Sequence, residues 1–169
     1  APLFDGLLNN LGQIGYSDIE RENVSNGAQS YLTEGDRVLY RYQGTLNIND
    51  ANKLAFGAER EETSANDQDS AIDSLFALYE YKPVETLTLT GGVRIDDHDG
   101  FGSETTGRAA AAWNATDQLI VRASWAQGFK APSIFQSTYI CTFCGLTAPN
   151  PNLKPETSEA FDIGVEWHS

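Results

Sequence analysis

The chain has 169 residues, of which 40% are hydrophobic and 21% charged, and its formal net charge at pH 7 is −13. Its length is enough for a sizeable core, but it contains no run of about 18 apolar residues, which excludes a transmembrane helix. An acidic protein surface repels phosphate backbones, so no nucleic-acid partner is expected.

Apolar and polar residues alternate with a period of two along most of the chain, and this pattern predicts β-strands. Residues 1–12 are expected to lack regular structure, and a first strand is expected near 15–24. A helix is the competing interpretation for the alanines of 106–114, but the turn that follows at once leaves too little length for one. The other predicted strands are 37–48, 53–61, 74–82, 86–96, 106–114, 118–130 and 158–168. In strand 74–82, Leu75, Ala77, Tyr79 and Tyr81 are expected to share one face, although the other face, with Phe76, Leu78 and Glu80, is not cleanly polar.

The connections between these strands alternate in length. Most of the strands have about 9–12 residues, which is close to the length that crosses a bilayer in a tilted barrel strand. Short turns on one side and long loops on the other are typical of outer-membrane barrels. The short turns are 49–52, 83–85 and 114–117, and the loops expected outside the cell are about 62–73, 97–105 and 131–155. The predicted fold is therefore all-β, an antiparallel meander of long transmembrane strands within a large outer-membrane β-barrel.

The two faces of the predicted strands differ in chemistry. One face carries Val93, Val121 and Val165, with tyrosines and tryptophans near strand ends, as expected for a lipid-facing surface with aromatic girdles. The other face carries charges that a dry core would not tolerate but a hydrated lumen would. The charged residues expected to face the lumen are Arg41, Glu59, Glu80, Arg94, Arg108, Arg122, Asp162 and Glu166.

Three segments resemble one known family. They are LTLTGGVRIDDH (87–98), WAQGFKAPSIFQ (125–136) and PNPNLKPETSEAFDIGVEW (149–167), and in this order they are similar to the barrel domain of TonB-dependent receptors. The resemblance implies a barrel of about 22 strands filled by an N-terminal plug. This chain has no plug, has too few strands and begins at Ala1 without methionine. We therefore expect residues 1–169 to be part of the barrel domain, processed or excised from a longer protein.

The resemblance also implies a function. The expected role is uptake of a scarce, bulky nutrient, with an iron–siderophore complex first and cobalamin next. The expected partners are outer-membrane lipid, the nutrient, and the TonB complex acting through the missing plug. A soluble, secreted, β-rich binding module is one alternative, and an outer-membrane barrel hydrolase is another.

Acidic residues around His98 were considered as a site. Asp96 and His98 share a strand face and could activate water, but no serine or second histidine is placed to complete a catalytic site. We therefore expect no enzymatic activity. Asp96, Asp97 and Asp99 are candidate calcium ligands, with a solvated acidic rim as the simpler interpretation. No other cofactor is predicted.

The long loop 131–155 contains Cys141 and Cys144. A zinc site usually needs four ligands, and a thioredoxin-like site needs a βαβ context. A small disulfide across the loop tip is the remaining prediction, with two free thiols as the alternative. Apolar loop residues are candidates for contact with the nutrient or for packing within the loop, and they are Phe101, Tyr139, Phe143 and Leu146.

Overall fold

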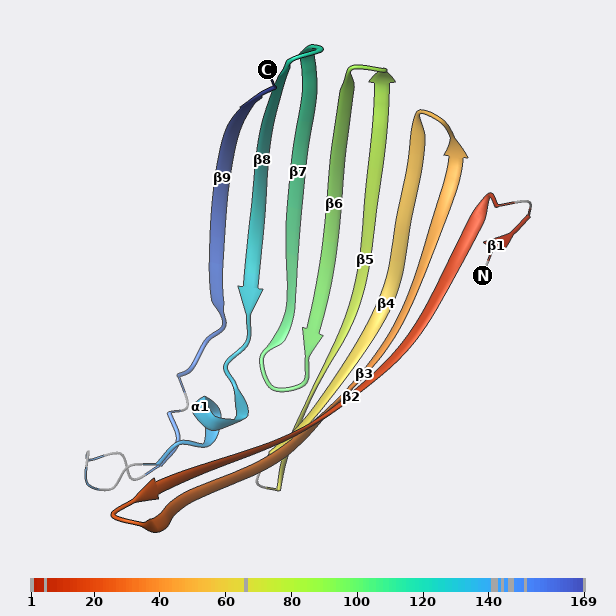
Figure 1. Ribbon diagram of the computed structural model, residues 1–169. Helices are drawn as coiled ribbons and strands as arrows, with labels where there is room; N and C mark the ends of the chain where they lie inside the picture. The colour runs from red at the N-terminus through yellow and green to blue at the C-terminus, as the bar shows by residue number, and fades with distance from the viewer. Residues whose placement is uncertain are drawn as a thin grey trace.

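A computed structural model describes residues 2–4, 6–65, 67–140, 143, 145, 148–150 and 152–168. These residues form one antiparallel sheet in which every strand pairs with the next one along the chain (Figure 1). The strands are β1 (Pro2–Leu3), β2 (Leu8–Ser25), β3 (Ala28–Asn49), β4 (Asn52–Ala65), β5 (Gln68–Val84), β6 (Leu87–His98), β7 (Gly102–Thr116), β8 (Leu119–Lys130) and β9 (Glu156–Trp167). The predicted all-β antiparallel meander is confirmed.

Tight turns join the strands at both ends of the sheet. At the β3–β4 turn, the Asn49 side chain accepts a hydrogen bond from Ala51 N at 3.0 Å and one from Asn52 Nδ2 at 2.7 Å. At the β2–β3 turn, Asn26 and Gly27 have φ angles of 53° and 78°. Two consecutive positive φ values are what a two-residue hairpin turn of the favoured twist requires, and Asn-Gly is the preferred pair.

Two of the predicted long loops are wrong, because most of their residues lie in strands. Segment 62–73 is strand on both sides of a short turn, because β4 continues to Ala65 and β5 begins at Gln68. In segment 97–105, only residues 99–101 separate β6 from β7. Both segments are polar on both faces, so they lack the alternation that marks a strand with one apolar face.

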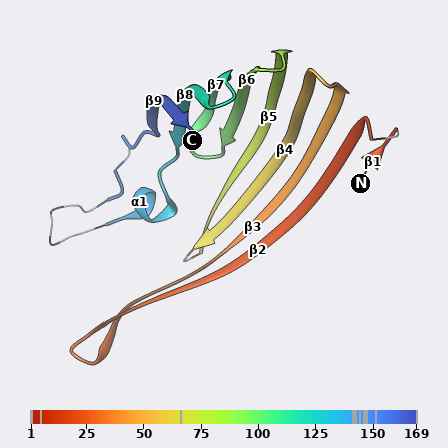
Figure 2. The ribbon, with the colours of Figure 1, turned by 45° about the horizontal axis from the view of Figure 1, so that its top comes forward.

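The N-terminal part of the chain is also more ordered than predicted. β2 begins at Leu8, inside the segment 1–12 that was expected to be irregular, and it includes the strand expected near 15–24. β2 has 18 residues and β3 has 22, so their hairpin extends beyond the other strands (Figures 1 and 2). The part of β3 before Gly35 has no partner in β4.

The sheet has the reverse of a soluble protein's pattern of burial. No hydrophobic side chain in the described part of the chain is buried, whereas the polar side chains of Ser74, Asp96 and His98 are 4%, 7% and 6% exposed. Val93 and Val165 are 48% and 68% exposed. A soluble sandwich would bury these valines between two layers, so this single curved sheet is not a soluble core.

Strand register defines two faces. The inner face contains Arg41, Glu59 and Arg94, and the outer face contains Tyr42, Leu75 and Val93. β5 has the predicted orientation, with Leu75 on the outer face and Glu80 on the inner face, and glycines on the neighbouring strands explain the apolar residues of its inner face. The Phe76 ring covers Gly57, and the Leu78 side chain covers Gly92. These apolar residues therefore lie on the inner face, where they pack over backbone that has no side chain.

One short helix follows β8. Ser133 and Gln136 form a reciprocal capping box at the start of α1 (Ile134–Thr138), within the segment predicted to be a long loop. The helix contacts β5. No helix in the described ranges has both the length and the apolar character needed to cross a bilayer.

Candidate functional site

A cavity of about 1430 Å³ lies against the inner face, at the end of the sheet where β4 turns into β5 and β6 into β7. Three parts of the chain line it: the end of the β2–β3 hairpin, the inner face of β4 to β6, and residues 129–140 with α1. Segments far apart in sequence thus border one concave space that is open on one side. Its size is that of a site for a large ligand.

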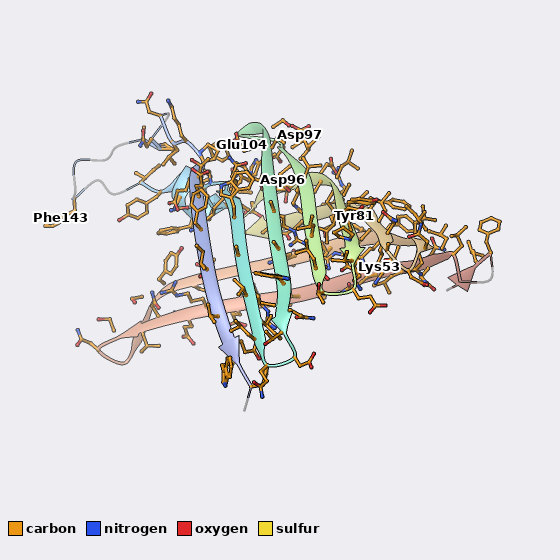
Figure 3. The ribbon with its side chains drawn as sticks, turned by 90° about the horizontal axis from the view of Figure 1, so that it is seen from above. Lys53, Tyr81, Asp96, Asp97, Glu104 and Phe143 are labelled. Carbon is orange, nitrogen blue, oxygen red and sulfur yellow. The ribbon has the colours of Figure 1, made fainter. Side chains whose placement is uncertain are left out.

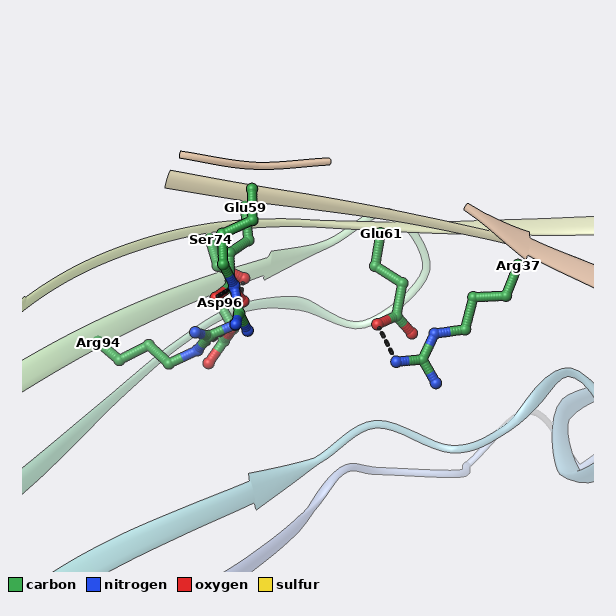
Figure 4. Close-up of polar contacts among 7 residues, drawn as sticks. Arg37, Glu59, Glu61, Ser74, Arg94 and Asp96 are labelled. Atoms are coloured by element: carbon green, nitrogen blue, oxygen red, sulfur yellow. Dashed lines mark hydrogen bonds and ion pairs between the residues drawn. The ribbon is translucent and has the colours of Figure 1, made fainter. Parts of the chain in front are cut away.

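Glu59 lies at the centre of a charged network on the cavity wall. Its Oε2 accepts a hydrogen bond from Arg94 Nη2 at 2.9 Å. Its Oε1 lies 2.6 Å from Arg41 Nε, but this N–H is not aligned with the oxygen, so the contact is an ion pair without a hydrogen bond. Figure 4 shows Glu59 and Arg94 converging from different strands. One carboxylate therefore balances two guanidinium groups.

Asp96 and Ser74 complete this network. Arg94 Nε donates to Asp96 Oδ1 at 2.8 Å, and Arg94 Nη2 donates to Ser74 Oγ at 2.8 Å. Ser74 Oγ in turn donates to Asp96 Oδ1 at 2.6 Å. The guanidinium carbon of Arg94 also lies 6.0 Å from the centre of the Phe76 ring. These contacts fix Arg94 in one orientation on the inner face.

Some of the other positively charged side chains on the cavity wall have an ion-pair partner, and others have none. Arg37 Nη2 pairs with Glu61 Oε2 at 2.9 Å, as Figure 4 shows. Arg21 and Lys130 also line the cavity, and within the described part of the chain neither has an ion-pair partner. The cavity thus has two positive groups without an ion-pair partner in this part of the chain, and one of them, Lys130, lies opposite Glu156 in the β8–β9 register.

His98 lies at the edge of the cavity in a second polar cluster. Its Nε2 lies 3.2 Å from Ser70 Oγ, and its Nδ1 accepts a hydrogen bond from Gly100 N at 3.0 Å. Its ring packs edge-on against Phe101, with 5.0 Å between the ring centres. Sequence reasoning found His98 but missed Ser70, which lies 28 residues earlier in the chain.

Ser70, His98 and Asp99 resemble a catalytic triad in distance only. Asp99 Oδ1 lies 3.0 Å from His98 Nδ1, but this contact lacks hydrogen-bond alignment, whereas the Gly100 N–H is aligned with Nδ1. A nitrogen that accepts from Gly100 carries no proton. Nε2 is then protonated and donates to Ser70, so the imidazole cannot take the serine proton.

All eight residues predicted to face the lumen lie on the inner face by strand register. Besides the Glu59 network, Arg122 Nη1 pairs with Glu166 Oε2 at 2.6 Å, and Glu80 Oε1 lies 3.3 Å from Lys82 Nζ. Arg108 and Asp162 have no ion-pair partner among the described residues. That this face lines the lumen of a complete barrel remains a prediction.

The candidate calcium ligands are not brought together. Asp96 belongs to the inner face, and the adjacent Asp97 belongs to the outer face (labelled in Figure 3). Asp99 Oδ2 accepts a hydrogen bond from Ala71 N at 2.8 Å. Across the described ranges, no three side chains of the metal-binding types form a group. Calcium binding stays an untested prediction.

The candidate ligand contacts lie in different places. Tyr139 lines the cavity and packs against Phe135, with 5.1 Å between ring centres. Phe101 packs on His98, and Phe143 is fully exposed and points away from the sheet (Figure 3). Leu146, Cys141 and Cys144 lie outside the described residues, so the predicted disulfide is not tested.

The outer face carries an apolar band with polar borders. On β4, Leu54, Phe56 and Ala58 face outward and are followed by Arg60, which forms ion pairs with Glu62 and Asp73, each at 2.7 Å. From Asn52 to Arg60 the strand rises about 26 Å, at about 3.3 Å per residue. That length matches the apolar band of about 25 Å on membrane barrels.

Comparisons with known proteins agree with this geometry. The chain matches the family model described as "TonB dependent receptor-like, beta-barrel" over residues 4–169. It is 29% identical over 158 residues to the vitamin B12 transporter BtuB of Photobacterium profundum, covering 86% of this chain and 24% of that protein. It is 32% identical over 93 residues to the ferric enterobactin receptor PirA of Pseudomonas aeruginosa, covering 47% of this chain and 12% of that protein.

Two solved structures show the same fold. The siderophore receptor PirA from Pseudomonas aeruginosa matches with a TM-score of 0.79 and 23% identity, over 96% of this chain and 32% of that one. OmpT, an outer membrane protein of Vibrio cholerae, matches with a TM-score of 0.62 and 14% identity, over 96% of this chain and 52% of that one. The chain thus spans about a quarter of BtuB and a third of PirA.

These matches confirm the location in the outer membrane. The relatives are named as transporters and receptors, so the hydrolase alternative has no support, in agreement with the hydrogen bonding of His98. The exposed apolar band and the lack of buried hydrophobic side chains in the described part argue against a soluble secreted module. The chain belongs to the family of TonB-dependent receptor β-barrels.

Proposed function

We propose that this chain is the barrel segment of a receptor that takes up a scarce, bulky nutrient, with an iron–siderophore complex as its ligand. The TonB complex would supply the energy by acting on a plug that this chain does not contain. The observation that carries the proposal is the cavity on the inner face, which is bordered by the β2–β3 hairpin, β4 to β6 and the α1 segment.

The cavity chemistry suits an anionic chelate. Arg21 and Lys130 have no carboxylate partner in the described part of the chain, so they attract negative charge over the distance of a Debye length. Tyr31, Phe135 and Tyr139 supply aromatic surface in the same cavity. A few charged groups among apolar walls are the usual composition of a site for a large organic ligand.

The relatives support the same class of ligand. Their names specify ferric enterobactin, hemin and vitamin B12. Each of these is a metal ion held by a large organic chelator. A chelate of this kind fits a cavity of about 1430 Å³ better than a single amino acid or sugar would.

Cobalamin is the second candidate. The match to the vitamin B12 transporter covers 86% of this chain, whereas the match to the ferric enterobactin receptor covers 47%. Cobalamin lacks the multiple negative charge of a ferric catecholate complex. The dependence of binding on Arg21 therefore separates the two ligands.

The test is binding of ferric enterobactin and cyanocobalamin to the purified full-length receptor. If the ligand is an iron chelate, ferric enterobactin binds, and R21Q and Tyr139→Ala each weaken binding about tenfold, which corresponds to about 1.4 kcal/mol. R60Q is the matched control, because Arg60 lies on the outer face. Binding of cyanocobalamin alone supports the second candidate. Equal losses in R21Q and R60Q would contradict the assignment of the cavity.

A further inference from the structure

Two neighbouring hairpins are tied together by side chains at the edge of the cavity. Asp99 lies just after β6, in the β6–β7 turn, and its Oδ2 accepts from Ala71 N of β5 at 2.8 Å. Asp99 N donates to Ala71 O at 3.1 Å. Ser70 Oγ donates to Asp99 Oδ1 at 3.4 Å and lies 3.2 Å from His98 Nε2. The turn is therefore attached to β5 beyond the last paired residues of the two strands.

His98 is the buried member of the cluster, whereas the side chain of Asp99 is 51% exposed. His98 is 6% exposed, and its two ring nitrogens contact Ser70 Oγ and Gly100 N. Phe101 covers the imidazole edge-on. Hydrogen bonds that are withdrawn from water contribute more than exposed ones, and loss of one partner leaves a buried polar group unpaired.

The cluster also supports the cavity wall. Ser70, Ile72 and His98 all line the cavity, and α1 contacts β5. We propose that Ser70, His98 and Asp99 form a latch that makes the ends of the β4–β5 and β6–β7 hairpins a single rigid wall on which α1 rests. Opening the latch releases both hairpin ends together and loosens α1.

The β2–β3 hairpin provides an internal contrast. Its residues 20–34 extend beyond the part of β3 that pairs with β4, which begins at Gly35. The side-chain contact described there, Ser30 Oγ to Asn23 O at 3.0 Å, stays within the same hairpin. This end therefore moves independently, whereas the two latched ends do not.

Hydrogen–deuterium exchange of the full-length receptor in detergent tests the latch. S70A removes a group on β5, and D99A removes one on the next hairpin. We expect either change to accelerate amide exchange about tenfold or more in both 68–73 and 98–102, and to accelerate exchange in 133–139. Residues 20–34 should not change.

D97A is the matched control, because it removes a carboxylate two positions from Asp99 but on the outer face, where no described contact uses it. It should not accelerate exchange at 68–73 or 133–139, because its loss removes only the repulsion between Asp97 and the facing Asp73. Heat-modifiable migration on gels confirms that each variant has a folded barrel before exchange is measured. Acceleration confined to the hairpin that carries the substitution overturns the proposal.

The double variant S70A/D99A tests whether Ser70 and Asp99 act together as one latch or independently of each other. If the two residues act as one unit, the double variant exchanges no faster at 98–102 than D99A does alone. If the two accelerations multiply, the residues act separately and the latch is overturned. Ligand binding is not used in this test, so its outcome does not depend on the proposed function.

Discussion

The outer and inner faces of the same strands are built for different surroundings. On β6, Val93 faces outward and is half exposed, while Arg94 next to it faces inward and binds Glu59, Ser74 and Asp96. Neither face is a hydrophobic core. The residue type at each position therefore follows from the face on which it lies, apolar toward lipid and polar on the opposite side, rather than from depth within the protein.

A charge placed on the outer face should have the largest effect on stability. Val93 lies between Ala77 and Gly107 within the apolar band. Val93→Arg should destabilise the full-length receptor by about 2–4 kcal/mol, because the guanidinium group must lose water to enter lipid. Denaturant unfolding in lipid vesicles measures this change.

Thr90→Arg is the control for that variant, since Thr90 lies on the inner face of the same strand, opposite Glu80. It should alter the free energy of unfolding by no more than about 0.5 kcal/mol. Equal losses for the two variants would show that the faces do not meet different solvents.

The next effect concerns the space available on each face. A Cβ at Gly57 on the inner face would lie 2.5 Å from Phe76 Cζ and would also clash with Tyr42 O, whereas a Cβ at Gly91 on the outer face meets nothing within 4 Å. Gly57→Ala should therefore cost about 1–3 kcal/mol through overpacking. Gly91→Ala should be neutral in the same unfolding experiment. A neutral Gly57→Ala would show that both the Phe76 ring and the backbone at Tyr42 can move to admit a methyl group.

Loss of the ion network should cost less than the charge in lipid at Val93 or the overpacking at Gly57. Glu59→Gln leaves Arg41 and Arg94 without their shared carboxylate and should cost about 1–2 kcal/mol, since both arginines retain some contact with water. Glu61→Gln breaks the more exposed pair with Arg37 and should cost under about 1 kcal/mol. If the order of the two losses were reversed, Glu59 would not be the centre of the network.

The smallest effect is expected outside the membrane band. Glu20 and Glu34 face each other directly across the β2–β3 hairpin, and like charges in this arrangement repel. Glu20→Gln should stabilise the hairpin end by about 0.2–0.5 kcal/mol, seen as slower amide exchange at 20–34. The gain should vanish in about 1 M salt. Faster exchange in the variant would contradict repulsion between the two carboxylates.

Sequence reasoning predicted the strands that cross the membrane but not those beyond it. β6 was predicted as 86–96 and is Leu87–His98, because one of its faces is apolar and the other is polar, which gives the sequence a period of two. At 62–73 both faces are wet, so the alternation disappears although the strands continue. The Asn26–Gly27 pair was the available signal for the long first hairpin.

The sequence predicted on which face of the sheet the site residues lie, but not which side chains contact one another. Alternation alone assigned Arg41, Glu59 and Arg94 to one side. Which side chains meet depends on the register between strands, as when Ser74 comes to lie opposite Asp96. Register follows from the turns, and a shift of one residue would reverse a strand's faces. The position of α1 over β5 depends on tertiary contacts, which a local pattern does not encode.

The overhanging end of the β2–β3 hairpin has a consequence for assembly on the cell surface. Residues 28–34 of β3 present backbone N–H and C=O groups that β4 does not pair with, and such edges attract strands from other chains. Glu20, Glu22 and Glu34 on this hairpin give any copy that approaches the same negative charge. Copies crowded in one membrane would thus repel one another electrostatically at the unpaired edge of β3, where strand pairing between chains would otherwise be easiest.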